Sequence, residues 1–157
     1  MYGQDTNTRE IIIDEYGADL KRLLAYLPYL RKQQNSLKQN FYDGEGGQKV
    51  VPVPVYDSTL LAFVKLAKST KFINRNYPYA YRHYKIETIE QEKEAMLKAK
   101  ITDIDLFRGI MSKYVLGGMS KATLWTTAAN EGIFVMALEC LDKLINEHGA
   151  TKYTPVV

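Results

Sequence analysis

Apolar side chains recur every three or four positions along much of the chain, which is the spacing of one face of an α-helix. Pro28 lacks a backbone N–H and clashes with the preceding helical turn, so the first helix is expected to kink or restart there. The chain is therefore predicted to be mainly α-helical. The apolar positions of this first stretch are Ile13, Tyr16, Leu20, Leu23, Leu24, Leu27 and Leu30.

Helix-capping and helix-stopping residues divide the rest of the chain. Thr102 and Ser120 are placed to cap two helices at their N-termini, and Gly117 and Gly118 are placed to stop the helix between them. Either Asp57 or the next residue can cap an earlier helix. The expected helical ranges are 58–69, 87–100, 103–117, 120–130 and 134–148.

Three segments lack this helical spacing. Residues 1–8 are polar and aperiodic and are predicted to form a loose tail, while the glycines of residues 40–50 indicate a flexible loop. Residues 50–56 alternate valine with proline, which favours an extended segment lying across the helices. We therefore expect one all-α domain over residues 1–157, a compact bundle of about five to seven helices with one extended Val-Pro segment.

Composition narrows the class of protein. A length of 157 residues with 46% apolar residues is ordinary for one globular domain. The longest apolar runs are far shorter than the roughly 20 residues of a membrane span, and the N-terminus lacks the pattern of a secretory signal. The protein is therefore expected to be cytoplasmic and to have no membrane partner. Its single cysteine, Cys140, excludes an intrachain disulfide and a cysteine-cluster metal site.

Charge is distributed unevenly along the chain. Between Asp57 and Glu87 there is no acidic residue and there are six basic ones, which leaves −3 for the rest of a chain whose total is +3. A cluster of carboxylates follows from Glu87 to Glu94, and we expect these carboxylates to form a solvated helix face. The basic residues are Lys65, Lys68, Lys71, Arg75, Arg82 and Lys85.

The second half of this basic segment is rich in tyrosine, and we predict that it forms a ligand-binding surface. Cations neutralise phosphate, arginine can bind it through two parallel hydrogen bonds, and tyrosine rings can stack on bases. Nucleic acid or a phosphorylated nucleotide, including a sequestered signal, is the predicted ligand. Two alternatives stay open, namely tyrosines buried between helices and docking on an acidic protein surface. The residues of this surface are Lys71, Arg75, Tyr77, Tyr79, Tyr81, Arg82, His83, Tyr84 and Lys85.

Catalytic and metal-binding patterns are not recognisable. His83 and His148 have no metal-ligand spacing to each other or to acids, and no nucleophile elbow or redox pair is present. We therefore predict no catalytic residues, no metal and no cofactor. A helix-turn-helix at residues 103–130 is a further alternative, but its second helix carries Lys121 as its one charge.

The stretch from residue 101 to residue 145 combines an aromatic-ended helix, a turn, a helix with tryptophan and a Gly-x-Phe entry to a last helix, at Tyr114, Gly118, Trp125, Gly132 and Phe134. In this pattern, with weaker similarity at residues 23–30 and 53–56, the chain resembles an uncharacterised bacterial family, domain-of-unknown-function family 6508. The resemblance implies a helical fold and brings no established activity. Where charged residues would be expected in that pattern, this chain has Leu116-Gly-Gly-Met119. An interaction module of a phage or mobile element, docking on a host protein, is the alternative function.

Overall fold

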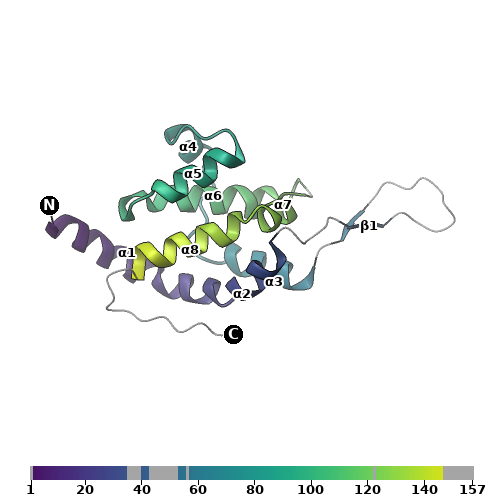
Figure 1. Cartoon of the computed structure of the whole chain (residues 1–157), viewed down its shortest axis with the longest axis horizontal. Helices are drawn as coiled ribbons and strands as arrows, with labels where there is room; N and C mark the ends of the chain where they lie inside the picture. The colour runs from purple at the N-terminus through teal and green to yellow at the C-terminus, as the bar shows by residue number, and fades with distance from the viewer. Residues whose placement is uncertain (1, 35–39, 43–52, 56, 122, 147–157) are drawn as a thin grey trace.

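The computed structural model describes residues 2–34, 40–42, 53–55, 57–121 and 123–146. Within these ranges the chain forms eight α-helices, one short 3₁₀-helix and one pair of strands (Figure 1), which confirms the all-α fold class. The helices are α1 (Tyr2–Leu24), α2 (Leu27–Gln33), α3 (Ser58–Lys68), α4 (Tyr77–His83), α5 (Ile89–Lys98), α6 (Ile104–Gly117), α7 (Leu124–Asn130) and α8 (Ile133–Asn146), with η2 (Ile101–Asp103) as the 3₁₀-helix.

Helices α6 and α8 form the centre of the bundle. Helix α6 packs against α3, α4, α5 and α7, and α8 packs against α1, α2, α5 and α7. The buried Phe134 of α8 joins the two halves, because its ring lies 5.0 Å from that of Phe63 in α3 and 6.4 Å from that of Tyr114 in α6. Figure 1 shows α4 and α5 on one side of these central helices, with α2 and α3 on the other.

The N-terminal helices follow the predicted division at proline. Helix α1 ends at Leu24, and α2 begins at Leu27 with Pro28 in its first turn, which confirms the restart. The predicted loose tail is wrong for residues 2–8, which form the first turns of α1. Extending a helix that is already anchored adds one hydrogen bond per residue without a new nucleation cost, so polar residues can continue it.

The extended Val-Pro segment is seen at residues 53–55. Strand β2 (Val53–Val55) pairs antiparallel with β1 (Asn40–Tyr42), and Phe41 lies opposite Pro54. Proline is tolerated because each strand of a two-stranded ribbon has an outer edge that needs no donor. Figure 1 shows the pair to one side of the helices rather than across them. The remaining residues of the predicted segment 50–56, and of the predicted loop from residue 43 onward, lie outside the described residues.

The turn after α6 differs from its predicted form. Ser120 caps no helix, since its hydroxyl donates to the Gly117 carbonyl at 3.3 Å and α7 begins only at Leu124. The Trp125 indole N–H donates to the Val115 carbonyl at 3.0 Å. A Cβ on Gly118 would lie 2.1 Å from that indole nitrogen, so the absence of a side chain at Gly118 permits this close packing.

Among the helices described, none combines the length and the apolar composition that a membrane span requires.

Candidate functional site

Helix α4 carries most of the predicted binding residues. Pro78 lies in its first turn, where the missing N–H costs no helical hydrogen bond. The helix ends where Lys85 takes a left-handed backbone conformation with φ of 57°, which lets the Ile86 N–H reach the Tyr81 carbonyl at 2.9 Å. Lys85 is thereby fixed at the C-terminal end of α4.

The inner side of α4 lies close against α6. Ala80 is buried, and a Cβ added to Gly109 of α6 would come within 2.6 Å of the Ala80 Cβ. The glycine therefore permits the close approach of the two backbones. Because this contact fixes the rotation of α4, it also decides which of the neighbouring tyrosines turn inward.

A buried carboxylate anchors the inward tyrosines. Glu92 of α5 is 0% exposed and accepts hydrogen bonds from Tyr114 at 2.6 Å, from Lys113 Nζ at 3.1 Å and from the Tyr81 hydroxyl. Lys113 Nζ also lies 4.9 Å from the ring centre of Tyr81 and 5.1 Å from that of Tyr114. Burial first, and then the neighbouring Glu92 carboxylate, raises the pKa of both phenols well above the ordinary range.

Two sequence predictions are wrong at this cluster. Tyr81 does not belong to an open surface, because its ring and hydroxyl are used between α4, α5 and α6. Glu92 does not lie on a solvated face, because it occupies the buried side of α5 together with Met96. The signal was present in the spacing, since Ile89, Glu92 and Met96 follow each other at three and four residues.

Two further tyrosines are only partly accessible to a ligand. Tyr84 is half-buried and donates to Asp103 Oδ1 at 3.0 Å, and burial together with this bond raises its pKa to about 12. Tyr77 is half-buried at the start of α4. The prediction of a shared open tyrosine surface therefore fails for Tyr81 and holds only in part for Tyr77 and Tyr84.

The outer side of α4 carries an exposed aromatic pair. Tyr79 is 57% exposed, and its ring stacks on that of the exposed His83 with centroids 5.9 Å apart and planes 14° apart. His83 in turn meets the Tyr84 ring edge-on at 4.9 Å. Arg82 and Lys85 are exposed next to this pair.

The segment before α4 brings the other two predicted cations. Its backbone is anchored to the bundle, with the Lys71 N–H donating to the buried Asp19 at 2.9 Å and the Asn74 N–H donating to Ser112 at 2.7 Å. The Lys71 and Arg75 side chains are exposed. The exposed cations and rings among the predicted binding residues therefore lie within one continuous stretch of the chain, residues 71–85.

We call the exposed members of this stretch the α4 surface. Within the described part of the chain, none of its four cations forms an ion pair. The ion pairs described use Arg22, Arg31, Lys93, Lys98, Arg108 and Lys113 instead. The α4 surface consists of Lys71, Arg75, Tyr79, Arg82, His83 and Lys85.

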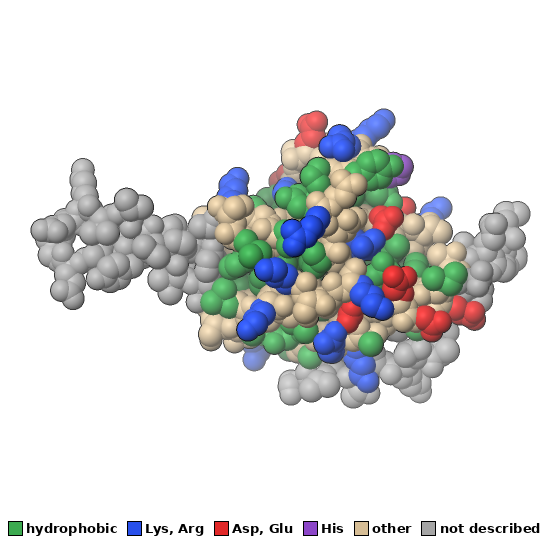
Figure 2. Space-filling model, turned by 180° about the vertical axis from the view of Figure 1, so that it is seen from behind, with side chains coloured by type: hydrophobic (Ala, Val, Ile, Leu, Met, Phe, Trp, Pro, Cys, Tyr) green, Lys and Arg blue, Asp and Glu red, His purple; other side chains and the backbone are tan. Residues whose placement is uncertain are grey.

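Figure 2 shows the charge distribution on the side opposite to that of Figure 1. Basic side chains are spread there from the top of the molecule to its lower edge, and most acidic side chains lie toward the right.

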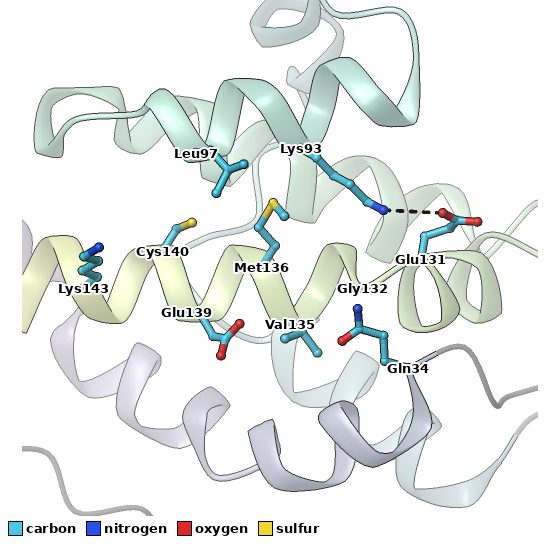
Figure 3. A pocket seen from close by; sticks show the side chains of 10 residues that line it. All are labelled: Gln34, Lys93, Leu97, Glu131, Gly132, Val135, Met136, Glu139, Cys140 and Lys143. Carbon is cyan, nitrogen blue, oxygen red and sulfur yellow. Dashed lines mark ion pairs between the residues drawn. The ribbon is translucent and has the colours of Figure 1, made fainter.

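A separate groove of about 270 Å³ lies between α5 and α8 (Figure 3). Leu97, Met136 and Cys140 face it, and the ion pair of Lys93 with Glu131, at 3.6 Å, closes one end. Burial raises the pKa of the Cys140 thiol, so the thiol stays protonated at neutral pH. The groove is thus mainly apolar and holds none of the predicted binding residues.

Metal binding and the helix-turn-helix alternative can be compared with the described residues. They contain no group of three or more His, Cys, Asp or Glu side chains that could hold a metal ion. His148 lies outside the described residues. In the alternative helix-turn-helix, Thr126 of α7 is buried, as are Ala128 and Ala129, so much of this helix packs into the bundle instead of facing outward.

Comparison of the chain with family models, with curated proteins and with solved structures finds no match. The resemblance to domain-of-unknown-function family 6508 therefore stays a prediction from the sequence. The class that the structure defines is an all-α bundle.

Proposed function

We propose that this protein binds nucleic acid or a phosphorylated nucleotide through the α4 surface, without catalysing a reaction. Arginine and lysine supply positive charge for phosphate, and the exposed ring pair supplies a flat face for a base. The same proposal places the protein in the cytoplasm, where both kinds of ligand are abundant.

The observation that supports the proposal is the combination of exposure and missing ion pairs. Tyr79 and His83 stack at the surface, while Arg82, Lys85, Arg75 and Lys71 have no acidic partner within the described residues. Unpaired cations on a protein surface attract anions and release condensed counterions when they meet a nucleic acid. The α4 surface therefore has both parts of a phosphate-and-base binding site.

The proposal is tested by direct binding at low salt. Fluorescence anisotropy with labelled DNA and RNA, and thermal shift with nucleoside mono-, di- and triphosphates, cover both ligand classes. We expect binding that weakens as salt rises, by a log-log slope of about −0.7 to −0.9 for each phosphate neutralised. The double variant Arg82→Glu, Lys85→Glu should abolish it.

A matched control changes the same charge elsewhere. Lys121 and Lys143 are exposed and form no ion pair within the described residues, and neither belongs to the α4 surface. The Lys121→Glu, Lys143→Glu variant has the same net charge as the test variant and should retain most of the binding. Equal losses in both variants, or no binding to any probe, contradict the proposal. The second result leaves docking on an acidic protein as the interpretation to test.

A further inference from the structure

We infer that the ligand of the α4 surface is a single strand with unpaired bases, and that Tyr79 with His83 is the platform on which a base stacks. This inference rests on the proposed function and names the ligand class. The first reason is the geometry of the ring pair, whose planes are nearly parallel, at 14°, on the outer side of α4. A base laid on the outer face of this pair continues the stack.

The second reason is that the base faces of a duplex are not accessible for stacking. In a duplex both faces of each base are covered by neighbouring base pairs, so an aromatic ring on a protein gains contact only when a base is unstacked. A duplex would therefore use only the cations of the α4 surface. A single strand uses both the cations and the rings.

The third reason is the short length of α4 and its close packing against α6. It has seven residues, a length of about 10 Å, and Ala80 holds its inner side against Gly109 of α6. A recognition helix enters the major groove with several base-reading side chains along its length. The short α4 instead exposes one stacked ring pair with cations beside it, which suits a strand crossing the surface.

The two residues of the proposed stacking platform can be changed without disturbing the bundle. Tyr79 is more than half exposed and His83 is exposed, and neither takes part in the cluster around Glu92. Tyr79→Phe keeps the ring and Tyr79→Ala removes it. The pair of variants therefore separates stacking from all other effects of the position.

The experiment compares three labelled probes of equal length, about 12 nucleotides, with the full chain. They are a mixed-sequence single strand, the corresponding duplex, and a single strand of abasic sugar-phosphate. We expect the base-containing single strand to bind most tightly. Tyr79→Ala should weaken its binding roughly 5- to 150-fold, the loss for one stacked base, and Tyr79→Phe should not.

The abasic strand separates a binding role of Tyr79 from a structural one. Tyr79→Ala should leave the affinity for this strand unchanged, whereas damage to the fold would lower the affinity for every probe. His83→Ala serves as the second variant and should behave like Tyr79→Ala.

Different outcomes overturn different claims. A duplex or an abasic strand that binds as tightly as the base-containing strand overturns the single-strand inference and leaves the proposed function standing. Stabilisation by free nucleotides without binding of any strand likewise overturns the single-strand inference and leaves the proposed function standing. If neither a strand nor a free nucleotide binds at low salt, the proposed function itself fails.

Discussion

At the scale of single residues, Glu92 is the feature that matters most for the fold. A carboxylate buried without partners would be strongly destabilising, and here two phenols and one ammonium group satisfy it. Because those partners come from α4 and α6 while Glu92 belongs to α5, the cluster joins three helices. Its loss would also release Tyr81, and with it the rotation of α4 that presents Tyr79.

Replacing this carboxylate should lower the stability of the bundle. Glu92→Ala leaves Lys113 unpaired, and because the Lys113 side chain is 33% exposed we expect a loss near the lower end of the range for a broken buried pair, about 3 kcal/mol. Chemical denaturation at neutral pH measures it. Glu90→Ala, at an exposed position of the same helix, should change stability by less than about 0.5 kcal/mol. Similar effects of the two substitutions would mean that the cluster adds nothing to stability.

The raised pKa values of Tyr81 and Tyr114 predict a dependence on alkaline pH. In the unfolded chain these phenols ionise near 10.0, whereas the folded protein keeps them protonated to higher pH. Unfolding then releases protons, so the stabilisation is complete below pH 10 and decreases as pH rises above it. Denaturation series from pH 8 to 11, followed with tyrosinate absorbance, test this. Tyr81→Phe with Tyr114→Phe should flatten the dependence, and an unchanged slope in that variant would assign it to other groups.

At the scale of elements, the contact between α4 and α6 decides which residues reach the surface. Tyr79 and Tyr81 are two positions apart in a seven-residue helix, yet one faces solvent and the other the Glu92 carboxylate. Helical geometry puts them about 200° apart around the axis, and the Ala80–Gly109 approach sets which direction is inward.

Two glycine substitutions should change the stability of the protein in opposite directions. Gly17→Ala in α1 meets only Ile13 at an ordinary 3.5 Å, so it should stabilise the protein by roughly 0.5–1 kcal/mol through helix propensity. Gly109→Ala gains the same propensity but meets Ala80 at 2.6 Å, and overpacking of about 1–3 kcal/mol should prevail. Thermal denaturation compares them. The double variant Gly109→Ala, Ala80→Gly should recover part of the loss, and a stabilising Gly109→Ala would show that α4 can move away without cost.

At the scale of the whole molecule, one apolar cluster extends from α1 to α8. The buried residues Leu23, Phe63, Ile110 and Phe134 belong to this cluster, although they come from four different helices. A core shared in this way predicts that the described helices lose their structure together rather than in separate steps.

Cooperative unfolding can be tested through Phe134, whose ring meets aromatic rings of α3 and α6. Phe134→Ala should lower the free energy of unfolding by about 3–5 kcal/mol. Circular dichroism and the fluorescence of Trp125, the one tryptophan, should report the same transition in the natural chain and in the variant. Separate transitions for the two probes would contradict a single cooperative unit.

The candidate site was predictable from the sequence to the extent that it depends on residue type. The run of cations without acids is a property of the chain itself, and its exposed position follows from the cost of burying an unpaired charge. The orientation of each tyrosine was not predictable in this way, because a phenol is as stable in a core with a hydrogen-bond partner as it is at a surface. The spacing of Glu92 with Ile89 and Met96 already placed it on the apolar face of its helix. The partners that satisfy its carboxylate, Tyr81, Lys113 and Tyr114, were not predictable, because they lie 11 to 22 residues away.

Apolar spacing and proline were enough to determine that the chain is helical and where most of its helices lie, because these are local properties of a few adjacent turns. Only the tertiary structure decided that Tyr81 faces Glu92 while Tyr79 and His83 stack outside. That choice depends on the contact of Ala80 with Gly109 and on hydrogen bonds between α4, α5 and α6. No local pattern encodes such contacts, because their energy appears only when distant segments meet.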